Sequence, residues 1–112
     1  MRYLTVTECE VPMGTRQEFV GAVQRWEKDA AGVDGGPELH AVYLHADDPA
    51  KVLIITQFES REDADKFRTT GLMQQFQDQL LDCTATSPNI NSYDLFYALG
   101  PEGAQVVFGE EA

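Results

Sequence analysis

One β-rich stretch, KVLIITQFE (residues 51–59), decides the fold of this 112-residue chain. Its run VLII (52–55) is apolar at every position, and successive side chains of a strand point to opposite faces, so both faces of this strand are apolar. A strand with nothing polar to present to water has to be covered on both sides. A single layer of helices covers only one side. The stretch therefore predicts a sheet with helices on one face and a second, separate cover on the other.

The neighbouring stretches supply partners for this strand. Residues 38–46 (ELHAVYLHA) form a second β-rich run, and the turn formers DDPA at 47–50 join the two runs as an antiparallel hairpin. Residues 2–10 (RYLTVTECE) alternate with a period of two, which is typical of a strand. Residues 90–99 (INSYDLFYAL) are expected to form the last strand, and QVVF at 105–108 is a candidate for a short edge strand.

Two helical segments complete the pattern. Thr15 stands three residues before Glu18, the spacing of a capping box, and an apolar stripe with helical spacing follows it. The stripe consists of Phe19, Val23, Trp26 and Ala30. Ser60 and Asp63 repeat the capping arrangement before a second helix. This helix is expected to bend or break near Gly71, because an interior glycine costs about 1 kcal/mol relative to alanine.

The element order is β-α-β-β-α-β over residues 1–100, which predicts an α+β, ferredoxin-like fold with one antiparallel sheet and helices on one face. The other face of the sheet is too apolar to lie bare in water. We therefore expect two copies of the chain to stack their open sheet faces in a homodimer. Residues 101–112 are expected to form an acidic C-terminal tail.

The charge balance disfavours several classes of partner. The chain has 8 Lys and Arg against 19 Asp and Glu, a formal charge of −11. Its basic residues are few and scattered, which argues against nucleic acid and against an anionic membrane surface. No apolar run approaches the about 20 residues that span a bilayer, and the N-terminus shows no signal-peptide stretch. Cys9 and Cys83 lack CxxC spacing and are expected to be reduced thiols of a cytoplasmic protein, with a single disulfide as the less favoured alternative.

Familiar catalytic and metal-binding motifs are missing from the sequence. His40 and His45 are the only histidines, and their odd interval on one predicted strand directs them to opposite faces, so we expect no metal site. None of the serines sits in a G-x-S-x-G elbow. The glycines at 32, 35 and 36 follow a helix and match no phosphate-binding loop, so they indicate a turn.

The aromatic residues are the most informative candidates for a binding site, because Trp26 and the second helical segment place large rings against the sheet. These rings either fill the core or wall an apolar cleft between sheet and helices, with a few polar groups aimed inward. In the second interpretation the expected substrate-binding residues are Trp26, Phe67, Phe76, Gln77 and Tyr93. The expected catalytic hydrogen-bond donors are Tyr43, His40 and Thr7.

Three stretches resemble a known family: VPMG (11–14) followed by Phe19, DDP (47–49) before the VLII strand, and above all QFESREDA (57–64). Over residues 2–99 the chain resembles the antibiotic biosynthesis monooxygenase family of small, dimeric α+β-barrel proteins. Members that act on polycyclic phenols use neither metal nor flavin, because the ionised substrate itself hands an electron to oxygen. The resemblance implies cofactor-independent oxidation of a small aromatic or polyketide-type compound, by a protein that favours the anion and excludes water.

The catalytic residues of the family do not carry over to this sequence. A haem-degrading branch uses Asn, Trp and His, and these positions fall on Thr7, Phe67 and Gln77. The Asn, Trp and Tyr of the phenol-oxidising branch align with Asp63, Phe67 and Met73.

This mismatch leaves two alternatives to a monooxygenase. One is a non-catalytic module of the same fold that binds a small molecule or serves as a structural dimer. The other is an isomerase or decarboxylase, which needs one titratable group in the cleft; His40, His45 or Asp94 would supply it.

Overall fold

The computed structural model describes residues 2–95, 97–100 and 103–106. Its first half contains β1 (Tyr3–Glu10), the 3-10 turn η1 (Met13–Thr15), α1 (Arg16–Ala30) and β2 (Leu39–Leu44). Its second half contains β3 (Lys51–Phe58), α2 (Arg61–Arg68), α3 (Leu72–Leu81), β4 (Asn89–Asp94), β5 (Tyr97–Gly100) and β6 (Gly103–Val106). The predicted order β-α-β-β-α-β is confirmed, with the second helical segment in two pieces.

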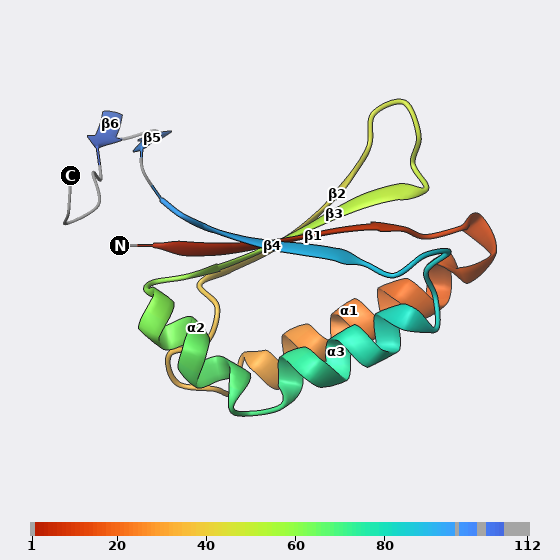
Figure 1. Ribbon diagram of the computed structural model, residues 1–112, viewed down its shortest axis with the longest axis horizontal. Helices are drawn as coiled ribbons and strands as arrows, with labels where there is room; N and C mark the ends of the chain where they lie inside the picture. Colours follow the sequence, from red (N-terminus) through yellow and green to blue (C-terminus); the bar gives the residue numbers. More distant parts are fainter. Residues whose placement is uncertain (1, 96, 101–102, 107–112) are drawn as a thin grey trace.

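The main sheet has the strand order β2-β3-β1-β4, and every pair in it is antiparallel. All three α-helices lie on the same side of the sheet (Figure 1). The fold is therefore α+β and ferredoxin-like, as predicted. The sheet of one chain is open and does not close into a barrel.

The two faces of the sheet differ in their cover. On the helix side Val52 and Ile54 are 4% and 1% exposed, and they pack in the core with the apolar stripe of α1. Their neighbours Leu53 and Ile55 point to the other side and are only half-buried. We call this second side the open face. It carries Leu4, Val6, Leu39, Ala41, Tyr43, Leu53, Ile55 and Tyr93. The expected strand with two apolar faces is thus confirmed, and the helices cover one of them.

The first helix begins differently from the prediction. Thr15 makes no side-chain cap, because the 3-10 turn Met13–Thr15 leads directly into α1. Its hydroxyl donates to the carbonyl oxygen of Cys83 at 2.8 Å and so connects the start of α1 to the end of α3. The expected Thr15–Glu18 capping box is wrong. Nevertheless the predicted stripe Phe19, Val23, Trp26 and Ala30 is buried throughout.

The break in the second helical segment is confirmed. Gly71 has φ 78° between α2 and α3, a left-handed conformation that glycine adopts without steric cost. Ser60 caps α2, since its Oγ accepts a hydrogen bond from the Asp63 N–H at 3.1 Å. The change of direction at Gly71 lets α2 cover one end of the sheet while α3 runs alongside α1 (Figure 1).

The expected last strand, 90–99, is two strands. β1 begins at Tyr3 opposite Asp94, so β4 has no further partner on β1 beyond that point. The chain continues instead into β5, which pairs with β6 in a separate two-stranded sheet. Of the expected edge strand 105–108, Gln105 and Val106 belong to β6; residues 107–108 lie outside the described residues, as do 101–102 and 109–112 of the expected tail.

Removing the cap of α2 gives a direct test of the local structure. Ser60→Ala is expected to lower the free energy of unfolding by about 1 kcal/mol, because the Asp63 N–H loses its acceptor. Chemical denaturation measures the loss. Ser87→Ala, at an exposed loop position, is the matched control and should leave stability within about 0.5 kcal/mol of the wild type. Equal losses in the two variants would contradict the capping role.

Candidate functional site

A pocket of about 200 Å³ lies between the sheet and the helices α2 and α3. We call it the helix–sheet pocket. Its lining combines apolar side chains with hydroxyls, amides and one guanidinium: Thr5, Phe58, Ala64, Arg68, Met73, Gln74, Gln77, Ile90 and Ser92. This combination is typical of a small-molecule site, in which apolar walls bind the ligand and a few polar groups orient it.

Strand register and helix periodicity together bring these residues to one place. Thr5 on β1 is directly opposite Ser92 on β4, so both hydroxyls lie on the helix side of the sheet. On α2, Ala64 and Arg68 are four residues apart and share one face of the helix. Met73 and Gln77 have the same spacing on α3. The pocket therefore lies where the two helices diverge over strands β1 and β4.

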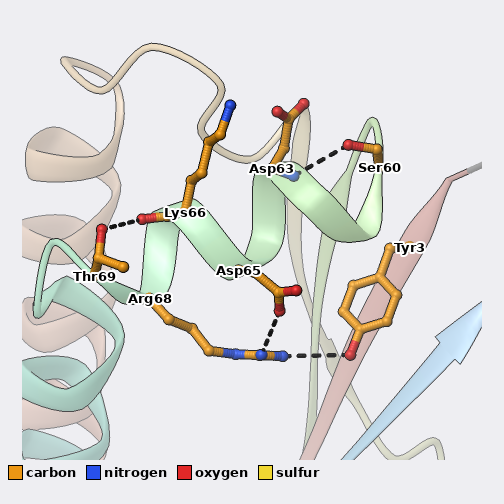
Figure 2. Close-up of polar contacts among 7 residues, drawn as sticks. All are labelled: Tyr3, Ser60, Asp63, Asp65, Lys66, Arg68 and Thr69. Atoms are coloured by element: carbon orange, nitrogen blue, oxygen red, sulfur yellow. Dashed lines mark hydrogen bonds and ion pairs between the residues drawn. The ribbon is translucent and has the colours of Figure 1, made fainter.

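Arg68 is the charged side chain of the pocket, and two neighbours hold its guanidinium. Nη1 donates to Oδ1 of Asp65 at 2.7 Å, and Nη2 donates to the hydroxyl oxygen of Tyr3 at 3.3 Å. Figure 2 shows Arg68 extending from α2 towards Tyr3 on β1, while Lys66 points away from this strand. Arg68 is half exposed, at 53%, so it lies at the mouth of the pocket and not in its floor.

Tyr3 lies beneath this arginine and is 6% exposed. The Ser92 hydroxyl lowers the pKa of the Tyr3 phenol most strongly; burial opposes this, and Arg68 and Arg61 lower the pKa further. The Arg61 guanidinium carbon stands 5.8 Å from the centre of the Tyr3 ring. Tyr3 is thus a buried phenol whose oxygen accepts a hydrogen bond from Arg68.

His40 is on the helix side of β2 and packs against Trp26, with ring centroids 4.3 Å apart. Its Nδ1 lies 3.2 Å from Oε1 of Glu27, and its side chain is 7% exposed. Within the described part of the chain, His40 Nε2 and Trp26 Nε1 are buried without a hydrogen-bond partner. Burial lowers the pKa of His40, and the Glu27 carboxylate opposes that shift in part. Burial therefore favours the neutral form of His40 in the fold.

The structure brings together some of the residues expected at the site. Trp26 contacts Phe67 and Phe76 with ring centroids 5.9 and 5.5 Å apart, and His40 joins this cluster. Thr7 is buried on the same face of the sheet. These side chains form the core beside the helix–sheet pocket and do not line it. Among the expected site residues, Gln77 alone belongs to the described lining.

Tyr43 and Tyr93 were expected in the same cleft, and this placement needs correction. Tyr43 pairs with Leu53 and Tyr93 with Leu4, so both point to the open face, where they are 56% and 52% exposed. The reason is the alternation of side chains along a strand, which separates Tyr43 from His40 three positions earlier. Their catalytic and binding roles stay predictions. His45 lies beyond the end of β2 and accepts the backbone N–H groups of Asp47 and Asp48.

Sequence reasoning missed Arg68, Tyr3 and Ser92. The place of Arg68 beside the core could have been inferred from the sequence, because Arg68 follows the buried Ala64 by one helical turn and so borders the apolar face of α2. Tyr3 and Ser92 had none, since their proximity to Arg68 depends on the pairing of β1 with β4 and on the position of α2. The contact between Tyr3 and Arg68 joins residues 65 positions apart.

A larger hollow of about 610 Å³ lies at the far end of the sheet, around the β2–β3 hairpin. Tyr43, His45, Lys51 and Leu53 line it, together with Glu8 and residues of the loop before β4. It opens partly onto the open face, the surface for which a second cover was expected. It is therefore a weaker candidate for a self-contained site than the helix–sheet pocket.

A family model described as antibiotic biosynthesis monooxygenase matches residues 2–79. The chain belongs to this family. The match spans β1 to α3 and so includes both helical walls of the helix–sheet pocket. No curated protein matches the chain.

Solved structures share the fold at low sequence identity. A proposed antibiotic biosynthesis monooxygenase of Nitrosomonas europaea is 20% identical with a TM-score of 0.72, over 88% of this chain and 94% of the other. A conserved protein of Methanosarcina mazei Go1 is 16% identical with a TM-score of 0.73, and the match covers 83% of this chain and 91% of that protein. Rv0793 of Mycobacterium tuberculosis is 12% identical with a TM-score of 0.70, and the match covers 85% of this chain and 95% of that protein. At these identities the likeness establishes the fold and leaves the reaction open.

The cysteines and the acidic residues offer no further reactive cluster in the part of the chain that the structure describes. Cys9 and Cys83 are free and buried. Burial raises the pKa of Cys9 to about 11 and also raises the pKa of Cys83, so neither thiol is an activated nucleophile. Across residues 2–95 and the two short strands that follow, no three His, Cys, Asp or Glu side chains gather as a metal site would require. None of the described helices has the length and apolar character of a membrane span.

The buried His40 predicts a pH dependence of stability. Because its folded pKa lies below its ordinary 6.5, the unfolded chain takes up the proton first, and stability is lost as the pH falls below that value. The variant His40→Phe keeps an aromatic ring against Trp26 and removes the imidazole that takes up the proton. Its free energy of unfolding should therefore fall less than that of the wild type between about pH 8 and about pH 5, measured by urea denaturation.

The matched control is Gln24→Ala on the exposed side of α1, which removes no titratable group and should retain the wild-type profile. Parallel pH profiles for wild type and His40→Phe would contradict a neutral, buried His40.

Proposed function

We propose that the helix–sheet pocket is the active site of a cofactor-independent monooxygenase-like enzyme that oxidises a small aromatic or polyketide-type compound in the cytoplasm. One observation carries the proposal: a pocket of about 200 Å³ has apolar walls and a single guanidinium, that of Arg68, in its described lining. The family provides the reaction class, in which an ionised substrate reduces oxygen directly. The pocket provides the groups that such a reaction needs from a protein.

Each wall of the pocket has a part in this chemistry. Phe58, Met73 and Ile90 bind the flat apolar body of the substrate and keep water from it. Arg68 and the hydroxyl of Ser92 face the substrate oxygen and stabilise its anion, which is the electron-rich form that reacts with oxygen. Gln77 orients the ring from α3. The cluster of Trp26, His40, Phe67 and Phe76, with Thr7 beside it, supports this wall from the core.

Oxygen uptake tests the proposal. The wild type is expected to consume oxygen with the one- and two-ring quinols of a panel of quinols and anthrones, above the rate of the buffer control. Arg68→Gln should lower kcat/KM by about tenfold or more, because the anion loses a charged hydrogen bond worth about 1.5–3 kcal/mol. Lys66→Gln removes the same charge from the same helix but on the side away from Tyr3, so it should retain wild-type turnover (Figure 2).

Uptake equal to the buffer control across the whole panel would refute the enzyme. A reduction of the same size in Lys66→Gln and Arg68→Gln would refute the role of this pocket, because it would reflect net charge alone.

The open face supports a second part of the proposal, a homodimer. Leu53 and Ile55 on β3 and Val6 on β1 form an apolar centre on this face, bordered by Glu8, Gln57 and Asn91. The described helices all lie on the opposite side (Figure 1). A second copy of the chain has the same surface, so pairing the two copies covers the open face of each, as in an isologous interface. Stacking two such sheets would complete the α+β barrel and would close the hollow beside Tyr43.

Sedimentation tests the dimer. The wild type is expected at twice the 12.5 kDa chain mass at micromolar concentration. Ile55→Lys places a charge opposite Val6 in the centre of the open face and should give a folded monomer, because that position is only half-buried within one chain. Lys51→Arg, at the end of the same strand, is the control and should stay dimeric. A wild type that sediments as a stable 12.5 kDa particle would refute the interface.

A non-catalytic binding module is the second candidate, and Phe67 favours it. Phe67 stands where both branches of the family carry a tryptophan, and at 1% exposure it lies entirely in the core. A protein that binds a small phenol in the helix–sheet pocket without consuming oxygen would match this candidate.

A further inference from the structure

The helix–sheet pocket contains one feature that the family resemblance does not supply: a guanidinium fixed in place by a buried phenol. Arg68 contacts Tyr3 on β1 through Nη2 and Asp65 on its own helix through Nη1. A free arginine side chain loses rotamer freedom when it binds a ligand. Here part of that loss has already occurred on folding, because contacts with Tyr3 on β1 and Asp65 on α2 restrain the half-exposed group before a ligand arrives.

Arg68 retains hydrogen-bonding capacity at the mouth of the pocket. A guanidinium carries five N–H donors in a fixed plane and no acceptor. Among the described residues two of the five are used, by Asp65 and Tyr3. Arg68 is also the one charged side chain in the described lining, where it is accompanied by the hydroxyls of Thr5 and Ser92. A ligand oxygen placed here meets donors, and an ionised oxygen gains more from them than a neutral one.

The charges around Arg68 are of both signs. Asp65 lies on the solvent side of α2 and binds Nη1, and Asp94 is paired with Tyr3 on the neighbouring strand. Arg61 lies against the Tyr3 ring. The whole chain carries a formal charge of −11, so its long-range field repels anions. Affinity for an anion therefore has to arise from short-range contacts at Arg68.

The volume of the pocket limits the size of the ligand. An apolar cavity of about 150 Å³ holds a single benzene ring. The helix–sheet pocket, at about 200 Å³, accepts one ring with a substituent or two fused rings, with the ionised oxygen directed to its mouth. A ring system of three or more rings exceeds this space.

We propose that the helix–sheet pocket is a selective site for compact phenolates of one or two rings, in which Arg68 binds the ionised oxygen and Tyr3 is the positioning residue that holds Arg68. The proposal rests on the proposed function, since it names the substrate class of the same pocket. It differs from the proposed function because it concerns whether the ionised or the neutral ligand binds, and it does not require that the ligand react.

The test uses 4-nitrophenol, whose two ionisation states absorb differently, and measures binding without oxygen. The wild-type chain is expected to bind the phenolate about tenfold more tightly than the neutral phenol, so the pKa of bound 4-nitrophenol shifts down by about one pH unit. 4-Nitroanisole has the same ring with a methylated oxygen and should bind about tenfold more weakly than the phenolate. Equal binding of 4-nitroanisole and the phenolate would overturn the proposal.

Three variants separate the roles. Arg68→Gln should abolish the shift, and the charge-matched Lys66→Gln should retain it in full. Tyr3→Phe keeps the buried ring and loses the contact to Nη2, so it should bind 4-nitroanisole as the wild type does but show a smaller ionisation shift. If Tyr3 had a purely structural role, Tyr3→Phe would weaken the binding of 4-nitrophenol and of 4-nitroanisole by the same factor. An undiminished shift in Arg68→Gln would overturn the assignment of Arg68.

A size series completes the test. 1-Naphthol is expected to compete with 4-nitrophenol, and a hydroxylated three-ring anthracene should compete about tenfold more weakly; equal competition would overturn the size limit. The outcome is independent of turnover. Selective phenolate binding without oxygen uptake would sustain this inference and refute the monooxygenase. Oxygen uptake without phenolate selectivity would support the monooxygenase and refute this inference.

Discussion

The central pair of strands, β1 and β3, carries apolar side chains on both of its faces, and each face needs its own cover. Helices α1, α2 and α3 protect one face, where Ile54 and Phe67 are almost completely buried. The opposite face, with Val6 and Ile55 at its centre, has no helix of the described chain upon it. Burial of apolar area stabilises a protein by about 25 cal/mol per Å², so both the folding of one chain and its proposed pairing derive from the same strands.

The helix–sheet pocket is a consequence of how the first of these covers is built. A single straight helix after β3 would run along the sheet, but the left-handed backbone at Gly71 divides the segment into α2 and α3. Where the two helices diverge, the sheet below is left partly uncovered. Small or polar side chains occupy that region, among them Ala64 and Ser92. The break in the helix therefore leaves a pocket in the layer between helices and sheet.

The polar groups of the core divide into two sets with different tasks. His40 and Glu27 connect β2 to α1, and the buried imidazole packs between aromatic rings, so its contribution is to stability. Arg68 and Ser92 line the pocket, and Tyr3 accepts a hydrogen bond from Arg68 beside it. The proposed binding of an organic anion depends on this guanidinium, because the chain otherwise carries an excess of carboxylates.

The sequence by itself determined the order of elements, the apolar stripe of α1, the cap at Ser60 and the break at Gly71, because these depend on neighbours within one or two turns. It also determined that the strand 51–59 needs two covers. Only the tertiary structure decided which side chains share the pocket. The register of three strand pairs places His40 with the helices and Tyr43 on the open face, and it brings Tyr3 to Arg68 across 65 positions. Local patterns contain no information about such contacts, since they arise only when the strands pair and α2 packs over them.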